Sequence, residues 1–116
     1  MNQQLIDAVI DNMEAEIEKI NGLWPPREDD DSPIGELNRS IATHLTGIIK
    51  GYQDAIWRHS DKWILSAVLN GIDDKSAKLI KIEDDGKGIH SAFATIELTT
   101  YGVMRTIVGA ALSADQ

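Results

Sequence analysis

Apolar residues recur at helical spacing from the start of the chain. Within residues 3–24 they follow one another at alternating intervals of four and three, which is a heptad pattern: Ile6, Ile10, Met13, Ile17, Ile20 and Trp24. Such a pattern places apolar side chains on one face of an α-helix. Because Leu5, Val9 and Leu23 widen this face, residues 3–24 are predicted to form an amphipathic helix that packs against other helices.

A proline-containing acidic segment at residues 25–31 is predicted to end this helix. It begins with two prolines and ends with four consecutive acidic residues. Proline removes a backbone donor and restricts the residue before it to extended geometry, so the segment is expected to be an exposed connector. Ser32 and Pro33 then predict a new helix, because serine is a good N-cap and proline is tolerated at the first helical position.

A second apolar face follows the acidic connector. Its members share helical spacing: Ile34, Leu37, Ile41, Leu45, Ile48, Tyr52, Ala55 and Ile56. The pattern continues to Val68, and the Asn70-Gly71 pair is predicted to end the helix, because glycine accepts the left-handed conformation found after helix ends. The sequence leaves open whether 33–70 is one helix or two, with Ser60 as a possible second N-cap.

The C-terminal third allows two interpretations. One is a β-hairpin near 77–98, because apolar and polar residues alternate over part of it. The other is a short helix near 74–83 and a long helix near 90–113, where Ile89, Phe93, Ile96, Thr100, Val103, Ile107 and Ala110 follow helical spacing. The helical pattern persists longer, so it is preferred. Gly102 and Gly109 lie on one flank of this helix, where they predict either a close helix approach or a break.

These patterns predict an all-α fold, a small helical bundle with two or three long amphipathic helices, with an α+β fold as the alternative. With 42% hydrophobic and 26% charged residues among 116, the chain has the composition of one globular domain spanning 1–116.

Charge and composition narrow the classes of function. Residues 1–31 hold nine acidic and two basic residues, a net charge of −7 out of −8 for the chain. This charge repels nucleic acid and favours a basic partner or surface. The absence of cysteine excludes disulfides and thiolate chemistry. The N-terminal residues show no signal peptide, no membrane span is predicted, and a cytoplasmic location is expected.

The strongest candidate site is the cluster at residues 57–63. Trp57, Arg58, His59 and Trp63 combine two large aromatic side chains with neighbouring cations. Indole faces can stack on a flat ligand, and arginine binds carboxylate or phosphate through its planar fork. The two tryptophans are six positions apart, so on one continuous helix their side chains would point about 120° apart. Both could contact one ligand only if the helix breaks or a second subunit completes the pocket.

A second candidate is the acidic loop at residues 83–90. Asp84, Asp85 and His90 are side chains of the kind that bind divalent cations, and Gly86 and Gly88 allow a tight turn. The spacing Asp84-x-Gly86-x-Gly88 resembles the D-x-G-x-G box of GHKL-type ATPases, in which a strand delivers the aspartate to adenine. Asn70 would have to be the family's magnesium-binding asparagine, yet it lies only 14 residues before Asp84. This leaves no room for the family's intervening strand, so the chain is not assigned to that family.

The sequence therefore favours a non-enzymatic, self-associating helical interaction or regulatory protein. Three apolar faces in so short a chain provide more apolar surface than a small monomer buries comfortably, which favours a homo-oligomer. One alternative is a protein that binds a small nucleotide-like or anionic ligand through Trp57–Trp63, and another is a metal-dependent enzyme that uses the loop 83–90. No cofactor is identified, and His44 is expected to serve packing rather than chemistry.

Overall fold

The computed structural model describes residues 3–24, 32–59, 62–84, 86 and 88–114. Within these residues the chain folds into helices and contains no strand, which confirms the all-α prediction and leaves no hairpin near 77–98. The described residues form four helices, and the predicted region 33–70 is divided between two of them. In chain order these are α1 (Gln3–Leu23), α2 (Pro33–His59), α3 (Lys62–Asp84) and α4 (Gly88–Ala114). The predicted connector at 25–31 and the predicted N-cap Ser60 lie outside the described residues.

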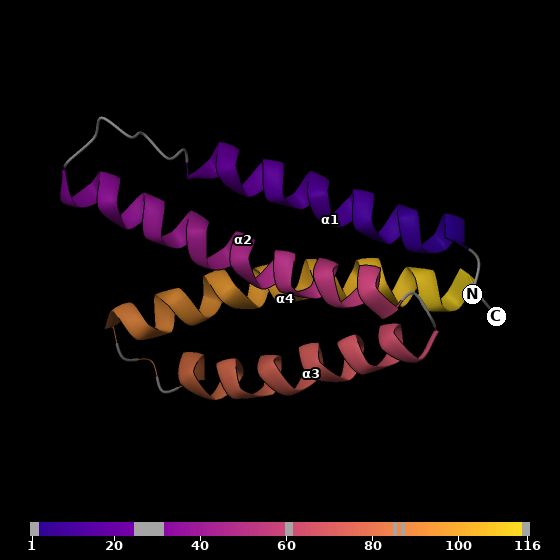
Figure 1. Ribbon diagram of the computed structural model, residues 1–116. Coiled ribbons are helices and arrows are strands. Elements are labelled where there is room, and N and C mark those ends of the chain that lie inside the picture. The colour runs from indigo at the N-terminus through magenta and orange to yellow at the C-terminus, as the bar shows by residue number, and fades with distance from the viewer. Residues whose placement is uncertain (1–2, 25–31, 60–61, 85, 87, 115–116) are drawn as a thin grey trace.

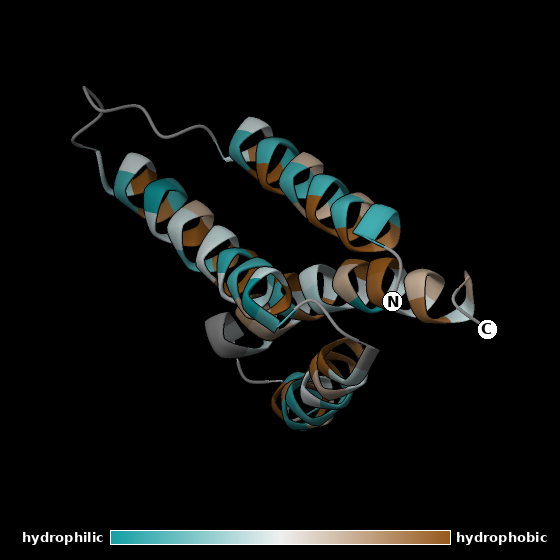
Figure 2. Ribbon diagram, turned by 45° about the vertical axis from the view of Figure 1, so that its right-hand side comes forward, coloured by the Kyte–Doolittle hydropathy of each residue, from teal (hydrophilic) through white to brown (hydrophobic). Residues whose placement is uncertain are grey.

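The helices form two antiparallel hairpins that lie across one another (Figure 1). α1 packs along α2, α3 packs along α4, and α1 also contacts α4. α1 and α3 therefore lie on opposite sides of the molecule (Figure 1). The N-terminal half of α2 diverges from α4, while the C-terminal half of α2 lies closer to α3 (Figures 1 and 2). The molecule is flat, with extents of 47 × 35 × 18 Å.

Local capping explains two helix boundaries. Ser32 caps α2 as predicted, because its Oγ accepts a hydrogen bond from the Gly35 N–H at 3.1 Å and its carbonyl accepts one from the Glu36 N–H at 3.0 Å. α3 ends where Gly86, with φ of +62°, donates its N–H to the Glu83 carbonyl at 3.1 Å. Glycine adopts this left-handed conformation without the steric cost that a side chain would impose.

The predicted helix end at Asn70-Gly71 is wrong, because α3 continues through it to Asp84. Glycine inside a helix costs about 1 kcal/mol relative to alanine. The neighbouring Val68 and Ile72 are buried in the core, and full burial of such side chains contributes about 1.5–3 kcal/mol each. Packing therefore outweighs the local preference. Likewise neither Gly102 nor Gly109 interrupts α4.

The core confirms the apolar face of α1 and shifts that of α4. On α1, Ile6, Val9, Met13, Ile17 and Ile20 are all buried, and Figure 2 shows hydrophilic residues on the outer sides of α1 and α2. Of the heptad positions predicted on α4, Thr100 is buried and most of the others are half-buried. The other buried residues of α4 lie beside this face: Ala94, Tyr101, Met104, Val108 and Ala111. The reason is that α4 contacts all three other helices, so a wider arc is buried than one heptad face.

None of the helices in the described ranges combines the length and the hydropathy that a membrane-crossing segment requires.

Candidate functional site

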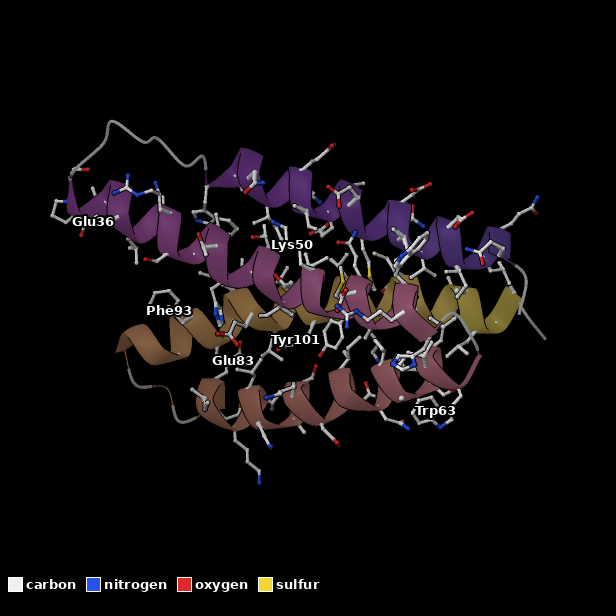
Figure 3. The ribbon with its side chains drawn as sticks, viewed as in Figure 1. Glu36, Lys50, Trp63, Glu83, Phe93 and Tyr101 are labelled. Atoms are coloured by element: carbon white, nitrogen blue, oxygen red, sulfur yellow. The ribbon has the colours of Figure 1, made fainter. Side chains whose placement is uncertain are left out.

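The structure places the four predicted site residues around the junction of α2 and α3 but does not gather them in one pocket. Trp57 and Trp63 expose 60% and 69% of their surface, respectively. Trp57 lies on α2 and borders a shallow groove shared with α1. Arg58 is also exposed, and its Nε donates to Asp54 Oδ1 at 3.1 Å along the same helix. Exposed His59 ends α2, and Trp63 lies near the start of α3 (Figure 3).

A different feature is an open, mainly apolar groove between α2 and α3. Its volume is about 470 Å³. The residues that line it are mainly small or aliphatic: Gly47, Ile48, Gly51, Tyr52 and Ala55 from α2, Ile64, Ala67, Val68 and Gly71 from α3, and Tyr101 from α4. On each helix the small residues recur every fourth position, so they share one face. We call this hollow the α2/α3 groove.

The glycines of the α2/α3 groove are not required by packing within the chain. A Cβ atom built on Gly47, Gly51 or Gly71 would meet nothing within 4 Å. Each glycine nevertheless weakens its helix by about 1 kcal/mol relative to alanine. The missing side chains leave space that no neighbouring helix of the described chain fills.

Two tyrosines form the floor of the α2/α3 groove. The rings of Tyr52 and Tyr101 pack edge to face, with centroids 6.3 Å apart and planes at 72°. Burial raises the pKa of Tyr52, and burial together with the nearby Tyr52 and Glu97 raises the pKa of Tyr101 to about 12. Both phenols therefore stay protonated well above neutral pH, and Tyr101 links α4 to α2.

The raised phenol pKa values predict a loss of stability in alkali. Below the ordinary tyrosine pKa of 10.0 the folded and unfolded states are both protonated, so the stability is fully present. As the pH rises from 10.0 towards about 12, the unfolded state loses the Tyr101 proton first, and the free energy of unfolding should fall by about 2 kcal/mol. Urea unfolding across this range measures the fall. Tyr101→Phe should show a smaller fall than the wild type, and an equal fall would contradict the assignment.

Sequence reasoning missed a polar contact between α2 and α4. His44 Nε2 and Glu97 Oε1 are 2.8 Å apart. The expectation that His44 serves only packing is therefore incomplete, because its exposed imidazole is paired with a carboxylate 53 residues away in the sequence. The available signal was weak: His44 lies at the edge of an apolar helix face, and a single sequence does not show which distant residue faces it.

The acidic loop predicted at 83–90 includes the end of α3 and the start of α4. Its hydrogen bonds join Glu83 of α3 to residues of α4. The Glu83 carboxylate accepts a hydrogen bond from the Thr95 hydroxyl at 2.5 Å, and its carbonyl accepts one from Ser91 at 3.1 Å. Asp84 is exposed at the end of α3, and Gly86 and Gly88 both have positive φ. Asp85 and the His90 side chain lie outside the described residues.

Among the described residues, no three His, Asp or Glu side chains are arranged to hold a metal ion. The helix that runs to Asp84 also differs from the strand on which GHKL-type ATPases carry their D-x-G-x-G box.

Comparisons of the chain with protein-family models, with curated proteins and with solved structures found no match.

Proposed function

We propose that this protein is a non-enzymatic, self-associating helical interaction protein whose copies meet through one face of α2 and α3. This α2/α3 face consists of the α2/α3 groove and Trp63. The observation that supports it most directly is the presence, on one face, of an open apolar groove and an exposed tryptophan beside it.

The position of Trp63 makes the α2/α3 face self-complementary. Trp63 precedes Ala67 by one helical turn and directly precedes Ile64, and both of those residues line the groove. Its indole is 69% exposed. In a two-fold dimer the same patch is used by both copies, so the Trp63 of each copy can enter the groove of the other. A buried tryptophan removes about 150–250 Å² from water and is a frequent interface hot spot.

The size of the folded chain also supports a partner on its surface. The radius of gyration is 15.4 Å, whereas about 13 Å is expected for a compact domain of this length. The accessible surface is 7150 Å², against about 6,300 Å² for an average monomer of this mass. Together with the 18 Å thickness, these values describe a flat molecule with more exposed surface than an average monomer.

The heptad pattern of α1 no longer supports self-association by itself. Its apolar residues pack inside the chain, where Ile6 and Met13 are fully buried. The proposal therefore rests on the α2/α3 face and not on the apolar faces that the sequence shows. A small-ligand site made jointly by Trp57 and Trp63 has less support, because Trp57 borders a separate groove between α1 and α2.

Solution mass tests the proposal. Light scattering over a hundredfold range of concentration should give a mass above that of one chain at the upper end. Trp63→Ala should weaken association at least about thirtyfold, since a hot-spot tryptophan contributes about 2 kcal/mol or more.

Trp57→Ala is the matched control, because Trp57 is similarly exposed and lies outside the groove. It should change the dissociation constant by no more than about twofold. A wild-type protein that stays monomeric at every concentration would refute self-association. Equal loss in the two variants would refute the α2/α3 face as the contact.

A further inference from the structure

A second hollow lies between α2 and α4, beside the part of α2 that diverges from α4 (Figure 1). Its volume is about 240 Å³. Phe93 projects from α4 towards α2 (Figure 3). Polar atoms contribute almost none of the surface of this hollow, which we call the α2/α4 pocket. Its wall consists mainly of the apolar side chains Ile41, Leu45, Phe93 and Ile96, and Ser40, His44 and Glu97 complete the lining.

The wall of the α2/α4 pocket is held in place by the core. Leu45 and Ile41 are only 2% and 8% exposed, respectively. Phe93 and Ile96 are half-buried and pack against the same core. Because side chains that are close-packed on their inner side cannot move freely into an adjoining space, the pocket is a preformed feature of the folded chain.

The charged groups near the α2/α4 pocket do not select a charged ligand. Glu97 Oε1 lies 2.8 Å from His44 Nε2, so each of these side chains already has a polar partner. The adjoining hollow shares Ser40 and His44 with the pocket and is lined by both Glu36 and Arg39, one residue of each sign. Since burial of an unpaired charge against an apolar wall is unfavourable, the wall selects an uncharged ligand.

The size and the chemistry of the wall fit one aromatic ring. Water bound against this wall would lack the polar partners that a buried water molecule needs. In another protein, an apolar cavity of about 150 Å³ with a similar lining stays dry and binds benzene. A pocket of about 240 Å³ therefore has room for a ring with a small alkyl group. An edge-to-face or offset contact with the ring of Phe93 adds to the affinity for an aromatic molecule.

We propose that the α2/α4 pocket binds a small, neutral aromatic molecule, held by contact with the apolar wall and not by charge. Such a ligand contacts both α2 and α4 and so joins the two hairpins beside the point where they diverge. The site goes beyond the proposed self-association and does not depend on it, because the residues that line the α2/α4 pocket and the α2/α3 groove are different.

Three probes with the same ring and different charges test this proposal: toluene, benzylamine and benzoate. At neutral pH the first is neutral, the second is a cation and the third is an anion. Titration of the wild type should give saturable binding of toluene with a dissociation constant of about 1 mM or below. Both charged probes should bind at least about fivefold more weakly. Equal affinities for the three probes, tighter binding of a charged probe, or no saturable binding of toluene would overturn the proposal.

A variant that fills the α2/α4 pocket tests its location. Ser40 is exposed and lines the pocket, and the ring of Ser40→Phe gains free energy by entering an apolar hollow. This variant should bind toluene at least about tenfold more weakly than the wild type. Ser113→Phe is the matched control, because Ser113 is exposed on α4 and does not line the pocket. It should change the affinity by less than about twofold. Equal affinities in the two variants would contradict the site.

A second variant tests the role assigned to charge. Glu97→Gln keeps the shape of the side chain and removes its charge. Because the proposal assigns binding to the apolar wall, the affinity for toluene should change by less than about twofold. Loss of toluene binding in this variant at an unchanged melting temperature would show that the carboxylate is required, and this would contradict the proposal.

A measurement on the wild-type protein covers the case in which a variant does not fold. In methyl NMR spectra toluene should shift the resonances of Ile41 and Ile96, which line the α2/α4 pocket. Ile48 and Ile64 are the controls, because they line the α2/α3 groove, which is also apolar. Shifts confined to Ile48 and Ile64 would mean that toluene binds in that groove, and this would overturn the proposed site.

Discussion

Ile17→Asp is expected to unfold the chain rather than to dissociate an assembly of folded copies. Ile17 is 5% exposed and belongs to the core formed by all four helices. A carboxylate placed there has no partner, and burying it costs several kcal/mol. Since a domain of this size has a total stability of about 5–15 kcal/mol, circular dichroism should show a large loss of helix or a melting temperature lowered by tens of degrees.

Ala15→Asp is the matched control on the same helix, because Ala15 is exposed. It should lower the free energy of unfolding by only about 1 kcal/mol, the order of the helix-propensity difference between alanine and aspartate. If Ile17→Asp instead remained folded and helical but lost self-association, α1 would be the contact between copies, as its heptad pattern alone suggests. That outcome would contradict the packing described above.

Ile49→Ala is expected to have the next largest effect. Ile49 is fully buried on α2, and removing such a side chain from a packed core costs about 2–5 kcal/mol. The same substitution at Ile34, which is 71% exposed near the start of the same helix, should cost less than about 0.5 kcal/mol. Urea unfolding of the two variants measures both values. Similar losses at the two positions would mean that α2 is packed differently from the structure.

Helix positions could be predicted from the sequence wherever apolar spacing and end signals agreed. The face of α1 and the Ser32 cap of α2 are examples, because each depends on residues within a few positions of one another. The end of α3 could not be predicted in this way. Asn70-Gly71 resembles a helix end locally, but the packing of Val68 and Ile72 in the core carries the helix past it.

The candidate surfaces depend on contacts between distant parts of the chain. The sequence alone therefore did not show which helices meet there. The pairs His44 with Glu97 and Tyr52 with Tyr101 each join α2 to α4 across about fifty residues. Spacing along one helix shows which face a residue occupies, but not which helix lies opposite. The composition of the Trp57–Trp63 cluster can be read from the sequence. Only the fold shows that Trp57 lines a groove shared with α1, whereas Trp63 is next to residues that line the α2/α3 groove.

The central claim is that copies of this chain bury Trp63 in one another's α2/α3 groove, and fluorine NMR of fluorotryptophan-labelled protein tests it most directly. The chain has three tryptophans, so three resonances are expected, and Trp63→Phe identifies the one in question. On raising the protein concentration, the Trp63 resonance should shift or broaden while those of Trp24 and Trp57 stay nearly constant. A Trp63 resonance that does not change with concentration, or a change confined to Trp57, would contradict the claim.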